Sequence, residues 1–138
     1  MIQTEKASER LVDQRVRNRI MEELLDLSQG ERCLDDSGAV EWFESFFDHF
    51  PYAGSTAPNF LLSTFTEDEL AALSPVVAAM QAALVDTPRF VTNAQLLASG
   101  WPRRIAPLAE AALATFLTRG RFSEEVEEEA PSSPVPWP

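Results

Sequence analysis

The chain has 138 residues and a formal net charge of −11, a length that suits one domain able to bury a core without a disulfide or a metal. A single cysteine, Cys33, excludes an internal disulfide. We expect a cytoplasmic location and no membrane span, because no secretory signal is recognisable and the apolar runs are short. A net acidic chain repels nucleic acid and attracts basic partners.

The charge is distributed unevenly along the chain. Residues 31–88 carry ten acids and one base, a charge of −9, whereas residues 89–121 carry five arginines and one acid, a charge of +4. Five glutamates give residues 122–138 a charge of −5. We predict a single helical domain over residues 1–122 and an acidic, then proline-rich tail over residues 123–138, flexible or loosely docked.

The first predicted helix begins at a cap formed by Thr4 or Ser8 and ends near Leu27, with Gly30 just beyond it. The arginines of the segment DQRVRNR alternate around this helix rather than sharing a face, which argues against nucleic-acid binding. Apolar residues recur at every third or fourth position, as they do on one face of a helix: Val12, Val16, Ile20, Leu24 and Leu27.

The segment AVEWFESFFDHFPY, which starts at Ala39, holds the densest group of aromatic residues. It predicts an amphipathic helix that is capped by Asp36 or Ser37 and ended by Pro51. At about 100° per residue, its apolar side chains cover an arc of roughly 160°, which is wider than one neighbouring helix can cover. We therefore predict that this helix is the centre of a compact, all-α bundle of five to six helices.

Two capping boxes mark the next helix starts. Thr66 and Glu69 form the first box, with Phe65 and Leu70 at the positions of a hydrophobic staple. Pro75 is expected to kink or break the helix that follows.

The second box opens a short helix to about residue 98, and Thr92 and Gln95 are its members. A last helix is predicted over residues 103–118, and Pro58 is expected to open one short turn earlier in the chain.

The favoured function is non-enzymatic and depends on protein–protein contact, as in a regulatory protein, an adaptor or an acidic inhibitor of the immunity type. The acids on the polar side of the aromatic helix and just before it would meet a basic partner surface. These candidate partner-binding residues are Asp35, Asp36, Glu41, Glu44 and Asp48.

A second hypothesis is a small-ligand-binding protein or a small enzyme with an aromatic pocket, formed by Trp42, Phe46, His49 and Trp101. His49 is the one histidine available for acid–base chemistry. The sequence has no zinc spacing, phosphate loop or nucleophile elbow, and we expect no cofactor, metal or catalytic residue. A helix-turn-helix over residues 92–108 is disfavoured, because Pro107 would fall inside its recognition helix.

Two alanine-rich segments, residues 76–85 and 105–117, are apolar on nearly every side. Helices of this kind are either fully buried or partly covered by another subunit. The candidate residues for a homodimer interface are Val76, Ala79, Met80, Ala83, Ala109, Ala112 and Phe116.

The acidic tail directly follows the basic segment of the chain. We therefore expect residues 124–129 to lie over Arg103, Arg104, Arg119 or Arg121. Trp137 would then rest on an apolar patch of the body. The alternative is a freely moving tail that adds only solubility.

Overall fold

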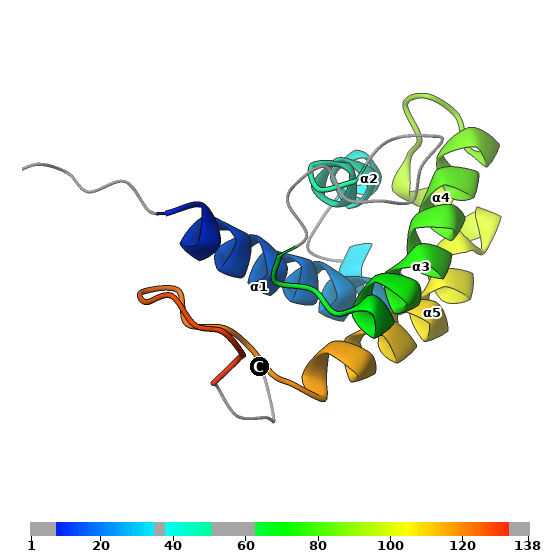
Figure 1. Ribbon diagram of the computed structural model, residues 1–138. Coiled ribbons are helices and arrows are strands. Elements are labelled where there is room, and N and C mark those ends of the chain that lie inside the picture. The colour runs from blue at the N-terminus through cyan, green and yellow to red at the C-terminus, as the bar shows by residue number, and fades with distance from the viewer. Residues whose placement is uncertain (1–7, 35–37, 51–62, 133–138) are drawn as a thin grey trace, which may run out of the picture.

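The computed structural model describes residues 8–34, 38–50 and 63–132 (Figure 1). Within these ranges the all-α prediction is confirmed. The turn predicted at Pro58 lies outside the described residues. The elements in chain order are α1 (Glu9–Ser28), the 3-10 helix η1 (Gly30–Leu34), α2 (Ala39–Phe47), α3 (Glu67–Asp86), α4 (Asn93–Ser99) and α5 (Trp101–Leu117).

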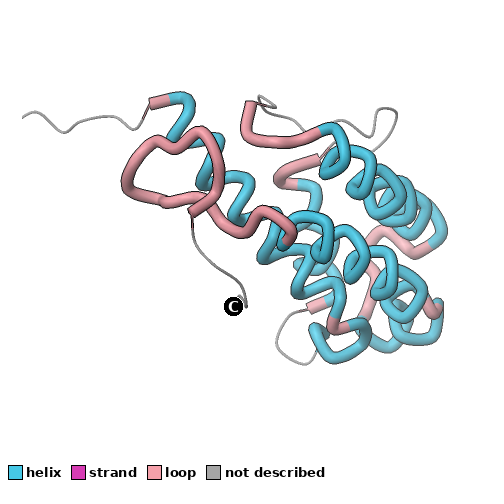
Figure 2. The backbone as a smooth tube through the Cα atoms, turned by 60° about the horizontal axis from the view of Figure 1, so that its bottom comes forward, coloured by secondary structure: helices cyan, strands magenta, loops and turns pink. Residues whose placement is uncertain are grey.

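The helix α5 makes the most extensive contacts with other elements. It packs along α1 and α3 and also contacts η1 and α4. In Figure 2 the loop that follows α5 lies next to the first turns of α1. Ile105, Ala109 and Phe116 of α5 are completely buried, and its small alanines allow close approach of neighbouring backbones. The central position predicted for the aromatic helix is therefore not confirmed, because a helix that is apolar on several sides can serve more neighbours than α2.

The aromatic face of α2 is buried as predicted. Trp42, Phe43, Phe46 and Phe47 all belong to the core. Their rings meet in the offset or edge-to-face arrangements that aromatic quadrupoles favour. The rings of Phe46 and Phe50, for example, stack with centroids 4.7 Å apart.

The start of α2 differs from the prediction. Its N-cap is Gly38, which has no capping side chain, and not Asp36 or Ser37. A side chain from another part of the fold supplies the missing acceptor, because Asn93 Oδ1 accepts a hydrogen bond from Ala39 N at 2.7 Å. One unpaired N–H at the helix start is thus satisfied by the first residue of α4.

Both predicted capping boxes are confirmed. Thr66 Oγ1 accepts from Glu69 N at 3.1 Å, and the Glu69 carboxylate accepts from Thr66 N at 3.2 Å. Thr92 and Gln95 repeat the arrangement at α4. These boxes satisfy backbone N–H groups that a helix start otherwise leaves unpaired.

Pro75 does not break α3, which is continuous from Glu67 to Asp86, so of the predicted kink or break the break is wrong. The proline removes the hydrogen bond to the carbonyl of Ala71 one turn earlier, but both residues are exposed to solvent, so water can satisfy that carbonyl. The buried neighbours Leu73, Val76 and Val77 hold both halves of the helix on the core.

By length and composition alone, α3 could also cross a membrane, although 33% of its most apolar window is already buried.

An ion network centred on a buried pair joins α1, α3 and the segment that follows α5. Arg17 and Glu69 are 0% and 1% exposed, and their closest charged atoms are 2.8 Å apart. Arg119 Nη2 lies 2.7 Å from the other oxygen of Glu69. Burial alone would raise the pKa of Glu69, but hydrogen bonds from Arg119 and Arg17 outweigh burial and lower it. Glu69 therefore serves both as a helix cap and as the anion between two guanidinium groups.

The segment after α5 folds back along α1 (Figure 1). The Gln14 side chain donates to the carbonyls of Ser123 and Val126 at 2.9 Å and accepts from Glu128 N at 2.7 Å. Asn18 exchanges two hydrogen bonds with the backbone of Phe122, at 2.9 and 3.2 Å. Polar side chains in the first half of α1 are therefore buried because residues 122–128 supply their hydrogen bonds.

The glutamates of this segment pair differently from the expectation. Glu124 forms ion pairs with Arg19 of α1 and with Arg121, so one of the four predicted arginines takes part. The others are engaged elsewhere: Arg103 with Glu31, Arg104 over the Trp101 ring, and Arg119 with Glu69. Trp137 lies outside the described residues.

Candidate functional site

Three of the predicted partner-binding acids share one exposed face of α2. Glu41, Glu44 and Asp48 are exposed, at spacings of three and four residues, which bring side chains to the same side of a helix. We call these three residues the α2 acidic face. The other two candidates, Asp35 and Asp36, lie outside the described residues.

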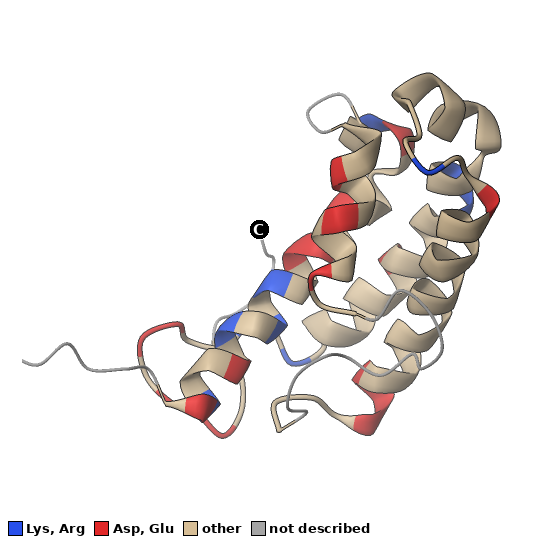
Figure 3. Cartoon of the chain, turned by 90° about the horizontal axis from the view of Figure 1, so that it is seen from above, with Lys and Arg blue, Asp and Glu red and all other residues tan. Residues whose placement is uncertain are grey.

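Helix α1 adds carboxylates to this face. The Ser45 hydroxyl of α2 donates a hydrogen bond to the Glu23 carboxylate of α1. Burial raises the pKa of Glu23, and the nearby charges of Asp26, Asp48 and Glu22 raise it further, against the effect of the Ser45 hydrogen bond. The carboxylates of α1 and α2 therefore belong to one negative region. Figure 3 shows the acidic turns of α1 following its arginines.

Little positive charge balances this region. Among the described residues, the ion pairs of α1 involve Arg17, Arg19 and Glu22, and none includes the three residues of the α2 acidic face, Glu23 or Asp26. Like charges that are not paired repel one another. The region therefore offers electrostatic attraction to a cationic surface and a cost to an anionic one.

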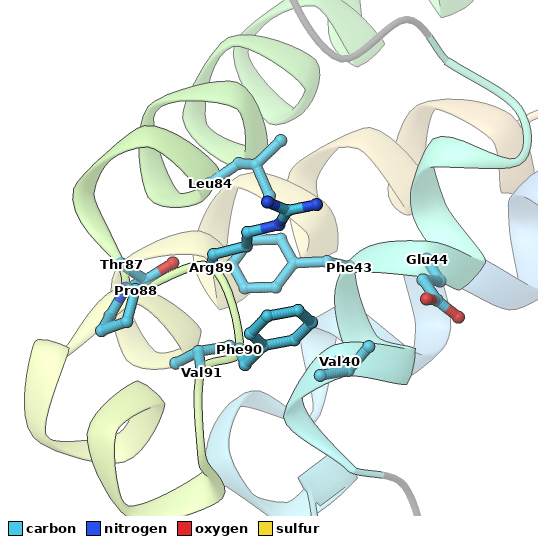
Figure 4. Close-up of a pocket in the computed structure, with 9 residues that line it drawn as sticks. All are labelled: Val40, Phe43, Glu44, Leu84, Thr87, Pro88, Arg89, Phe90 and Val91. Atoms are coloured by element: carbon cyan, nitrogen blue, oxygen red, sulfur yellow. The ribbon is translucent and has the colours of Figure 1, made fainter.

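An apolar groove borders the α2 acidic face (Figure 4). It has a volume of about 450 Å³ and lies between α2 and the loop that joins α3 to α4. Phe90 is 78% exposed and Val40 is 41% exposed, which is unusual for apolar side chains of this size. The groove is lined by Val40, Phe43, Glu44, Leu84, Thr87, Pro88, Arg89, Phe90 and Val91.

Sequence reasoning missed the groove, although one signal for Phe90 was present. Val91 is the inward-pointing residue of a hydrophobic staple and is buried together with Leu96. The residue directly before it, Phe90, then points outward. Val40 belongs to the apolar side chains of α2, but it is 41% exposed and lines the groove.

The aromatic pocket of Trp42, Phe46, His49 and Trp101 stays a prediction, and the described residues place its members as follows. Trp42 and Phe46 are core residues, and His49 is half-buried at the end of α2. Trp101 lies at the start of α5, where its indole N–H donates to Asp86 at 2.8 Å. The surface depression that Trp101 lines contains none of the other three residues.

The candidate dimer residues belong mainly to the core of the single chain. A second copy would have to contact outward-facing residues of these helices instead, and the homodimer itself stays a prediction. Ala79 is half-buried. The buried candidates are Val76, Met80, Ala83, Ala109, Ala112 and Phe116.

The ionisable groups near α2 give little support to nucleophilic chemistry. Burial raises the pKa of the Cys33 thiol and lowers the pKa of His49. A thiolate–imidazolium pair would shift both pKa values in the opposite directions. In the described part of the chain, no group of three or more His, Cys, Asp or Glu side chains is placed to hold a metal ion.

No family of known proteins, no curated protein and no solved structure matches this chain. The proposals below therefore depend on the geometry, burial and charge of the surface itself.

Proposed function

We propose that this chain is a non-enzymatic helical protein that acts through protein–protein contacts, with the α2 acidic face as its surface for a basic partner. The observation that carries the proposal is the negative region shared by α1 and α2, in which no described Lys or Arg forms an ion pair with Glu23, Asp26 or the α2 acidic face. A partner with lysine or arginine side chains would relieve the repulsion among these carboxylates. Regulation, adaptor binding and masking of a basic surface all fit this chemistry.

The experiment is a selection of random displayed peptides with the whole protein as bait. We expect the enriched peptides to be net basic. The triple variant Glu41→Gln/Glu44→Gln/Asp48→Asn should weaken their binding by about tenfold or more, with a smaller loss at high salt.

A matched control removes the same charge elsewhere. Glu110, Glu125 and Glu129 are exposed and take part in no ion pair among the described residues. Their replacement by Gln preserves the net charge of the triple variant. Equal weakening by both triple variants would mean that only total charge matters, and the α2 acidic face would lose its assignment.

We also propose a homodimer as a second, independent contact. The outward side of α3 is apolar and small, and includes Pro75, Ala78, Ala82 and Val85, of which Val85 is 84% exposed. Light scattering after size exclusion should then give twice the mass of one chain. A single-chain mass at micromolar concentration would remove this proposal.

A further inference from the structure

We propose that the groove between α2 and the α3–α4 loop receives one bulky apolar side chain of a basic partner segment, while lysine or arginine residues beside it meet the α2 acidic face. This inference rests on the proposed function and specifies it. It assigns specificity to the groove and long-range attraction to the carboxylates.

Exposure of apolar surface on both walls is the first support. Phe90 comes from the α3–α4 loop and Val40 from α2, and in the view of Figure 4 the ring of Phe90 lies between Val40 and the ring of Phe43. Phe43 is buried and Leu84 is half-buried, so the interior of the groove is apolar. Covering such a surface with an aromatic or branched aliphatic side chain removes apolar area from water on both molecules.

The walls of the groove are held in place before any partner binds. The hydrogen bond from Ala39 N to Asn93 Oδ1 connects the start of α2 to the start of α4, next in sequence to the lining residue Val40. Thr87 is the C-cap residue of α3, and its hydroxyl and its N–H both donate to the carbonyl of Ala83, at 2.9 and 3.1 Å. A preformed groove avoids part of the ordering cost of association.

The charges around the groove select a basic segment. Glu44 lies on one wall, and Glu41 and Asp48 lie on the same side of α2. An acidic segment would have to approach these carboxylates, whereas a lysine or arginine would pair with them. Arg89 lines the opposite wall, with its guanidinium 5.4 Å from the centre of the Phe90 ring and no ion pair among the described residues.

Arg89 also indicates that the occupant is a peptide rather than a simple alkyl cation. A guanidinium offers five N–H donors and no acceptor. The backbone carbonyls of a bound segment would accept from it without adding negative charge. The segment would therefore lie with its cationic side chains toward α2 and a carbonyl toward Arg89.

The test uses two synthetic lysine-rich peptides that differ only in one central residue, tryptophan or alanine. Their affinities for the wild-type protein are measured by titration calorimetry, then repeated with Phe90→Ser and with the control Val126→Ser. Phe90 is 78% exposed and Val126 is 61% exposed, so neither change should alter thermal unfolding. We expect the tryptophan peptide to bind wild type and Val126→Ser about tenfold tighter than the alanine peptide, and this preference to disappear in Phe90→Ser.

Two failures are distinguishable. The groove is overturned as the binding site if Phe90→Ser keeps the tryptophan preference, or if wild type shows no such preference. In either case the proposed function survives if Glu41→Gln/Glu44→Gln/Asp48→Asn still weakens the binding of both peptides. Peptides that bind wild type and this triple variant equally, or that bind neither, overturn both the groove and the acidic face.

Discussion

Removing the carboxylate of Glu69 should cost more stability than any other single change of charge in the described part of the chain. Glu69→Ala leaves Arg17, which is completely buried, without its anion, and it also deletes one hydrogen bond of the capping box. Breaking a buried ion pair by removing one partner costs about 3–5 kcal/mol. Domains of this size are stable by roughly 5–15 kcal/mol, so the variant should retain only a part of its stability.

Urea unfolding followed by circular dichroism measures this loss. With a denaturant slope of roughly 2 kcal/mol per molar, the midpoint should fall by about 1.5–2.5 M. Glu67→Ala is the matched control, because Glu67 is an exposed acid in the same helical turn, and it should cost less than about 1 kcal/mol. Adding Arg17→Met to Glu69→Ala should recover part of the loss, because the buried cation disappears with its anion.

The pH dependence gives the same network a second readout. The pKa of Glu69 is lowered in the folded protein, so its contribution is present above the pKa of the unfolded state and is lost as pH falls through the folded value. Wild type should therefore lose stability on acidification more steeply than Glu69→Gln. A loss below about 1 kcal/mol for Glu69→Ala at neutral pH would refute the reasoning, since it would mean that water reaches Arg17.

Three further changes test other parts of the structure. Phe47→Ala should lower the free energy of unfolding by about 3–5 kcal/mol, whereas Glu44→Ala should change it by less than ~0.5 kcal/mol; similar losses in denaturant melts would mean that the faces of α2 are misassigned. Glu23 has a raised pKa in the folded state, so its ionisation destabilises the protein as pH rises. Glu23→Gln should therefore raise the melting temperature at neutral pH and leave it unchanged in acid. An equal shift of the melting temperature at both pH values would contradict this reasoning. Gln14→Ala removes three hydrogen bonds to the C-terminal segment and should speed amide exchange over residues 123–128, whereas unchanged exchange rates there would show that Gln14 does not hold the segment.

The features that the sequence predicted correctly are local ones. The capping box of Thr66 and Glu69 joins residues three positions apart, and Gly30 has the positive φ expected just past the end of a helix. The α2 acidic face was likewise predictable, since helical periodicity alone places its members together.

The features that the sequence did not predict depend on distant contacts. Gln14, Arg17 and Asn18 are buried because Gly120 and the residues after it return to α1, more than one hundred positions later. Polar residues in the first half of α1 predict a solvent-exposed face, because the sequence does not indicate that the C-terminal segment packs on them. The extensive contacts of α5 with α1 and α3 were not predicted for a related reason, since the number of neighbours of a helix is a property of the tertiary arrangement.

The groove shows the same limit for the candidate site. Its shape depends on Asn93 reaching Ala39, 54 positions away, and on Phe90 being left outside when Val91 is buried. The sequence predicts the local structure of α2 and of the start of α4, but it does not predict that the α3–α4 loop lies against α2. Contacts between residues close in the sequence were predictable, whereas contacts between residues far apart in the sequence were not.

The most direct test of the proposed function is an amide chemical-shift map of the whole protein during titration with a basic peptide from the displayed library. A basic partner on the α2 acidic face predicts shifts concentrated at residues 40–48 and at Phe90, and these should shrink as salt rises toward physiological strength and beyond. The outward side of α3 and the C-terminal segment should change little. Shifts concentrated on α3 or along residues 122–132, with residues 40–48 unchanged, would contradict the assignment of the partner surface.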